Sequence, residues 1–176
     1  MEPPEEARRP AVAPPEEAWR EAPRAPLVLP EGIEAGLIGG LAVAGVFLVR
    51  DAWSGDPMQT PSVLGAALVA GAAAAATSAP AAGSAALYHA VHFFLWIALG
   101  FAASSVMRGA ERTRTRWLPP LAAILAILPL IALDIWVQRA GIDRLHLWLG
   151  GLAGIGAMGA FLAWRHPGAL RASPAD

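Results

Sequence analysis

The chain has 176 residues, of which 56% are hydrophobic and 15% are charged, and its formal net charge is -1. Soluble domains average about 45–50% apolar and about 25% charged residues, so this composition indicates a membrane protein. The near-neutral charge argues against nucleic acid as a partner. The chain contains no cysteine, which excludes disulfides, thiolate metal sites and cysteine nucleophiles.

The first 30 residues differ from the rest of the chain. Proline recurs throughout this segment and alternates with glutamate and arginine. Such a sequence buries too little apolar surface to offset its ordering entropy, so residues 1–30 are expected to form a disordered tail. Residues 167–176 are expected to form a short C-terminal tail.

Four long apolar stretches follow the N-terminal tail, at residues 33–53, 84–107, 117–138 and 142–164. A helix needs about 20 mostly apolar residues to cross the hydrocarbon core of a bilayer, and each stretch meets that length. The sequence therefore predicts an all-α bundle of four membrane helices within residues 31–166. Pro129 lies in the middle of the third stretch and predicts a kink, because proline removes a helical hydrogen bond.

The segment between the first two stretches predicts a further, shorter helix at about residues 61–76. Thr60 is expected to be the N-cap and Pro61 the first helical residue. The run is mostly alanine and glycine, which is weakly apolar for a fifth span. We expect an interfacial or re-entrant helix that covers the bundle in the outer leaflet.

The arginines predict the orientation of the bundle. Eight of them fall on the side of the chain ends, namely Arg20, Arg24, Arg108, Arg112, Arg114, Arg116, Arg165 and Arg171. The opposite side carries Arg50, Arg139 and Arg144. By the positive-inside rule both termini are cytoplasmic, in a multi-pass protein of a bacterial inner (plasma) membrane. The loop from Arg108 to Arg116 is expected to face anionic lipid, and His166 is expected at the membrane interface.

Two glycine pairs predict close helix contacts. Gly36 and Gly40 form a GxxxG pattern in the first stretch, and Gly150 and Gly154 form another in the fourth. Small residues at this spacing let helix backbones approach each other in lipid. We expect these faces to support self-association or binding to other membrane subunits, besides contacts with the bilayer.

The polar residues of the spans predict one layer near the outer ends of the helices. His89, Asp134 and His146 each lie about 10 Å outward of their helix centres, and His92 lies one turn deeper. The inner halves of the spans are expected to be almost free of polar residues. If the helix faces converge, three imidazoles and one carboxylate meet.

This layer has several interpretations. The four side chains could bind zinc or another transition metal. A histidine pair could hold a b-type haem between helices. Histidine and aspartate could instead exchange protons with a quinone headgroup or along a transport path. We favour a structural role without a cofactor, in which Asp134 pairs with Arg50, Arg139 or Arg144 and Asp51 pairs with Arg144.

One set of motifs resembles a pattern in small uncharacterised bacterial four-helix membrane proteins. The glycine-rich first helix ends at Asp51, and Gly55-Asp56-Pro57 and Thr60-Pro61-Ser62-Val63-Leu64-Gly65 follow. Tyr88 and His92 supply the tyrosine and histidine that open the next helix in that group. The resemblance covers the first half of the membrane region. It implies a bacterial inner-membrane protein but does not imply any particular activity.

No complete catalytic set is present, so an enzyme is not the favoured class. We expect an accessory or structural subunit of a larger membrane assembly, because small residues line the helix faces and the N-terminal tail is free. The alternatives are a protein that binds haem, a quinone or a metal through the histidine layer, and a small proton-coupled transporter.

Overall fold

The computed structural model describes residues 28–75, 79–115, 117–138 and 143–170, which form helices and turns without a strand. Four helices are long and apolar enough to cross a membrane: α2 (Val28–Ser54), α5 (Ala82–Thr113), α6 (Leu118–Val137) and α7 (Arg144–Arg165). The all-α class and the four apolar helices are therefore confirmed, and they are compatible with an integral membrane protein. Most of both predicted tails, together with Arg116 and Arg139, lies outside the described residues.

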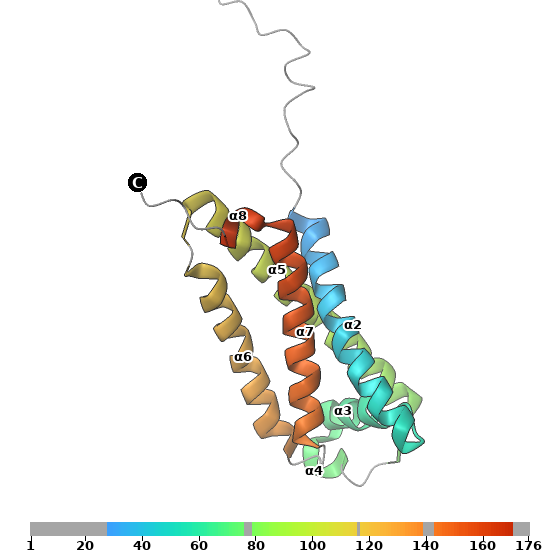
Figure 1. The fold of residues 1–176 in the computed structure, drawn as a ribbon. Coiled ribbons are helices and arrows are strands. Elements are labelled where there is room, and N and C mark those ends of the chain that lie inside the picture. The colour runs from blue at the N-terminus through green and yellow to red at the C-terminus, as the bar shows by residue number, and fades with distance from the viewer. Residues whose placement is uncertain (1–27, 76–78, 116, 139–142, 171–176) are drawn as a thin grey trace, which may run out of the picture.

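The four long helices run in alternating directions, so the described chain begins and ends at the same end of the bundle (Figure 1). The short helix α8 (Pro167–Leu170) lies beside the start of α2 and the end of α5, and we name this the α8 end. The short helices α3 (Gln59–Ala70) and α4 (Ala72–Ala75) lie at the opposite end, which we name the α3 end.

Two helices extend further than the hydropathy predicts. Helix α2 begins at Val28 instead of residue 33, and α5 continues to Thr113 instead of ending at residue 107. The added turns carry charged side chains that pair with one another across the bundle, so these turns stay helical although they are polar. Helix α6 continues through Pro129 as one helix.

Glycines bring α2 close to α5 and α7. A Cβ atom on Gly36 would lie 2.5 Å from the backbone of Ile97, and a Cβ atom on Gly154 would lie 2.5 Å from the ring of Trp96. Gly150 faces the ring of Phe47 in the same way. Both GxxxG faces are therefore covered by helices of the same chain, and their packing needs no second copy of it.

The turn into α3 differs from the prediction. The helix begins at Gln59, and Met58 occupies the N-cap position without a side-chain cap. Thr60 is not the N-cap, because its backbone and hydroxyl both donate to Asp51. The predicted helix at residues 61–76 is also interrupted at Gly71, whose φ of 86° suits glycine and ends α3.

Apolar side chains form two buried clusters along the bundle axis. The cluster nearer the α8 end is built on Met107, Met158 and Leu162. The cluster nearer the α3 end is built on Phe47 and Leu64, together with Leu130 and Leu147 of α6 and α7. Helix α3 thus packs against the bundle through its buried face.

Candidate functional site

The four residues of the predicted polar layer lie on three helices and do not meet. His89 and His92 belong to α5, Asp134 to α6 and His146 to α7. Asp134, His146 and His92 each bond to a different neighbour. No group of three histidine, aspartate or glutamate side chains that could hold a metal occurs in the described part of the chain.

Asp134 and Arg144 form an ion pair at the α3 end. The guanidinium donates from Nε at 3.1 Å and from Nη2 at 2.7 Å, so both carboxylate oxygens are engaged. The amide of Gln138 lies 3.4 Å from the same carboxylate. Arg144 is one of the three partners considered from the sequence, and the carboxylate is buried while Arg144 is exposed.

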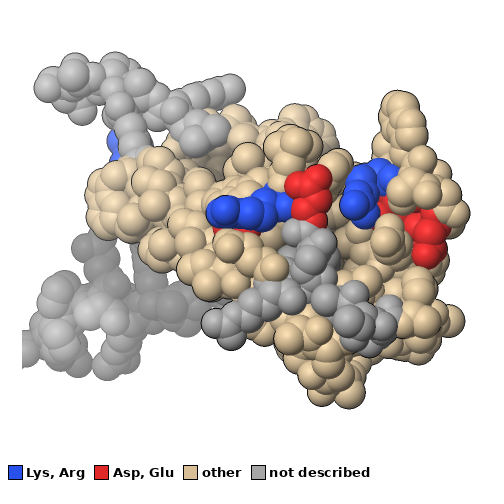
Figure 2. Space-filling model, turned by 90° about the horizontal axis from the view of Figure 1, so that it is seen from below, with Lys and Arg blue, Asp and Glu red and all other residues tan. Residues whose placement is uncertain are grey.

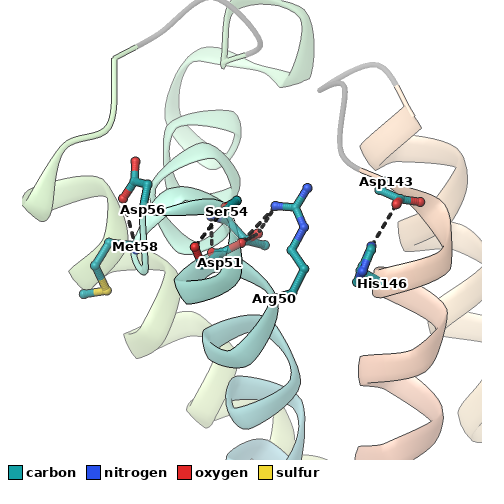
Figure 3. Close-up of polar contacts among 8 residues, drawn as sticks. Arg50, Asp51, Ser54, Asp56, Met58, Asp143 and His146 are labelled. Atoms are coloured by element: carbon teal, nitrogen blue, oxygen red, sulfur yellow. Dashed lines mark hydrogen bonds and ion pairs between the residues drawn. The ribbon is translucent and has the colours of Figure 1, made fainter.

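His146 pairs with Asp143 at the start of α7 (Figure 3). Its Nδ1 lies 2.8 Å from the carboxylate, which also accepts the backbone N–H of Leu145 at 2.9 Å. The hydrogen bond from the backbone N–H of Leu145 is the main cause that holds the pKa of Asp143 below its usual value, and the hydrogen bond with His146 lowers this pKa further. His146 therefore belongs to a helix cap.

Asp51 is fully buried and joins α2 to α3. Its carboxylate accepts the backbone N–H and the hydroxyl of Thr60, both at 2.7 Å, and Arg50 donates to it at 2.9 Å (Figure 3). Asp51 thus pairs with Arg50 and not with Arg144, because its side chain points into the turn before α3. Figure 2, which looks onto the α3 end, shows acidic and basic side chains lying side by side there.

His92 is buried and uses both ring nitrogens. Its Nε2 lies 3.1 Å from the carbonyl oxygen of Gly40 on α2, and its Nδ1 lies 3.1 Å from the hydroxyl of Tyr88 one turn earlier. The Tyr88 ring stacks on the imidazole with centroids 5.1 Å apart. His89, by contrast, has a buried Nδ1 with no hydrogen-bond partner among the described residues.

His92 and Tyr88 line an apolar cavity of about 680 Å³. Side chains from α2, α3, α5, α6 and α7 form its wall, among them Phe47, Leu64, Trp96, Leu130, Trp136 and Leu147. Pro129 also lines it. Helix α6, the least buried of the four long helices, forms one side of this cavity. Of the predicted layer, only His92 lines this cavity.

A second ionic cluster, which the sequence analysis did not predict, lies at the α8 end. Glu31 of α2 accepts from Arg108 of α5 and from Nε2 of His166, both at 2.5 Å. Nδ1 of His166 lies 2.8 Å from Glu111. Glu31 and His166 are buried. The four residues lie just outside or at the edges of the predicted spans, so hydropathy alone could not reveal that they meet.

This cluster corrects one expectation and leaves another open. His166 is 6% exposed and is held between two carboxylates, while its place at the membrane interface stays a prediction. Arg108 lies within α5 and pairs with Glu31, whereas the chain leaves the helix only at Arg114, which has a left-handed φ of 53°. Arg112 and Arg114 are exposed at this end.

No family model, curated protein or solved structure matches this chain. The resemblance to small bacterial membrane proteins therefore stays a prediction. The function has to be argued from the contacts of the chain itself.

Proposed function

We propose that the protein is an integral membrane protein that binds a lipophilic small molecule in the cavity beside His92. The observation that carries this proposal is the cavity of about 680 Å³, whose wall is apolar apart from the Tyr88–His92 pair. Binding sites for small molecules typically measure about 300–1,000 Å³ and combine an apolar wall with a few polar groups.

The ligand reaches such a site from the bilayer. Helix α6 contributes Ala126, Pro129 and Leu133 to the cavity wall, and it is the least buried of the four long helices. A molecule dissolved in lipid can enter beside a loosely packed helix without crossing the charged ends of the bundle. A quinone, one of the ligands considered from the sequence, belongs to this class.

The donor atoms support a hydrogen-bonded ligand better than a haem or a metal. A haem iron or a metal ion needs an imidazole nitrogen with a free lone pair. Both nitrogens of His92, the histidine in the cavity wall, already have partners. His146, whose Nδ1 is bonded to Asp143, does not line this cavity. Asp134 is engaged by Arg144 through both oxygens.

The charge distribution supports an orientation for the bundle. At the α8 end the described residues include Arg108, Arg112, Arg114 and Arg165, whereas the α3 end has Arg50 and Arg144. The positive-inside rule then puts the α8 end in the cytoplasm and α3 in the outer leaflet of a plasma membrane. Exposed Arg112 and Arg114 would face anionic lipid headgroups.

A pair of variants on α6 tests the proposal. Ala126 lines the cavity, whereas Ala123, one turn earlier, is exposed and does not line it. We expect a decyl-substituted benzoquinone to quench the fluorescence of Trp96 and Trp136 saturably in lipid nanodiscs. Ala126→Phe fills the cavity and should weaken this binding about tenfold or more, which corresponds to about 1.4 kcal/mol.

Ala123→Phe is the matched control and should bind the quinone like the wild-type protein. Quenching that rises linearly without saturation would mean that the quinone only partitions into the lipid. Equal saturable binding by both variants would place the ligand elsewhere. Either result would refute the proposed cavity site.

A second candidate function is that of an accessory subunit within a larger membrane assembly. The observation that favours it is the exposed apolar surface of α6, on which only Leu130 and Asp134 are buried among the described side chains. The mass of the complex extracted from native membranes in mild detergent tests it. A single chain alone in the micelle would exclude a stable assembly.

A further inference from the structure

The hydrogen bonds of His92 determine what the cavity wall can offer to a ligand. The carbonyl oxygen of Gly40 can only accept a hydrogen bond, so Nε2 of His92, which lies 3.1 Å from it, carries a hydrogen and donates. The ring therefore has a fixed orientation, with Nδ1 directed toward Tyr88.

The imidazole is neutral in this environment. His92 is 8% exposed, its ring contacts are the aromatic rings of Tyr88, Phe93 and Trp96, and no carboxylate among the described residues bonds to it. A buried imidazolium without a counter-charge would be costly. In a neutral ring whose Nε2 is protonated, Nδ1 is an acceptor, so the hydroxyl of Tyr88 donates to it across 3.1 Å.

This arrangement leaves Tyr88 as an acceptor toward the cavity. Its single hydroxyl hydrogen is used by His92, while the phenolic oxygen keeps lone-pair capacity. At the Tyr88–His92 pair the wall therefore offers an acceptor and no free donor.

We infer that the ligand is a lipophilic alcohol or phenol, whose hydroxyl donates to the oxygen of Tyr88. This inference rests on the proposed function and specifies its ligand. A carbonyl headgroup offers only acceptors and would face the acceptor of Tyr88, so at this position a hydroquinone binds better than the corresponding quinone. No proton or electron transfer is part of the inference.

The test compares two ligands with the same ring and tail, one with hydroxyl donors and one with methoxy groups in their place. Binding of a decyl-substituted hydroquinone and of its dimethyl ether is measured under anaerobic conditions by competition with a fluorescent lipophilic probe in nanodiscs. In the wild-type protein the hydroquinone should bind on the order of five- to tenfold more tightly, the contribution of one hydrogen bond. Tyr88→Phe should abolish this preference and leave the affinity of the ether unchanged.

His89→Phe is the matched control, because His89 lies on the same turn of α5 but does not line the cavity, and it should retain the preference. If the wild-type protein binds both ligands equally and Ala126→Phe still loses competition, the inference about the ligand is overturned. The cavity site would then still stand. An unchanged preference in Tyr88→Phe would also overturn it. No competition by either ligand in any variant would remove the proposed function as well.

Discussion

The two ends of the bundle use charged residues in different ways. At the α8 end, Glu31 bonds to Arg108 and His166, which are 77 and 135 residues away in the sequence. At the α3 end, the partners are close in sequence: Asp51 bonds to Arg50 and Thr60, and Asp134 bonds to Arg144. The first set joins separate helices, whereas the second set mainly fixes turns and helix ends.

The α8 cluster joins two acidic and two basic side chains. Glu31 and Glu111 each face one ring nitrogen of His166, and Arg108 donates to Glu31 as well. Because Glu31 and His166 are buried, removing Glu31 takes an acceptor from two basic side chains at a site with little water, which is more costly than breaking an exposed pair.

The largest effect is therefore expected from Glu31→Ala. It removes the shared acceptor of Arg108 and His166 and should lower the free energy of unfolding by about 3–5 kcal/mol. Reversible unfolding in mixed detergent micelles measures this change. Glu34→Ala is the control, since Glu34 lies on the same helix but is exposed, and should change stability little. Similar losses in both variants would contradict the described cluster.

Asp51→Ala should have the next largest effect. Its buried carboxylate satisfies the backbone N–H and the hydroxyl of Thr60, so its loss should cost about 1–3 kcal/mol and loosen α3. The same unfolding measurement, together with amide hydrogen exchange over α3, checks this. Asp56→Ala, which removes an exposed contact with Met58 in the same turn, should leave α3 protected.

Double variants sharpen the comparison between the ends. Glu31→Ala and His166→Ala act on one network, so their combined effect should differ from the sum by about 0.5–3 kcal/mol. Glu31 and Asp51 are 20 positions apart on α2, about 30 Å. Their substitutions should add. Additive behaviour of the first pair would argue against direct contact between Glu31 and His166.

The smallest effect is expected from Asp143, through the pH dependence of stability. Its pKa is lower in the folded protein than in the unfolded chain, so the ionised carboxylate contributes stability above the unfolded pKa. That contribution disappears as the pH falls through the lower folded pKa. Asp143→Ala should thus be slightly less stable than wild type near neutral pH and equal to it in strong acid, as thermal unfolding across pH would show.

Hydropathy predicted the four long helices and their order because each apolar run is long enough to bury itself in lipid without help from the others. It missed the first turns of α2 and the last turns of α5. Those turns contain Glu31, Arg108 and Glu111, which look like solvent-exposed charges until their partners are known.

The candidate site was predictable only in part. His92 and Tyr88 share a helical face, which the spacing of four residues indicates from the sequence alone. The partner of His92 on the other side is a backbone carbonyl of α2, and any residue carries such a carbonyl, so no sequence signal marks Gly40. The sequence placed His89, Asp134 and His146 at similar depths and His92 one turn deeper, but depth does not determine which way each side chain faces.

The sequence by itself thus determined the membrane-type composition and the number of long helices, and it included Arg144 among the possible partners of Asp134. The tertiary structure alone decided which helix faces meet. It joined Glu31 to His166, covered the glycine faces within one chain and left a cavity where α6 packs loosely. The physical reason is that helix formation depends on neighbouring residues, whereas packing depends on side chains far apart in the sequence.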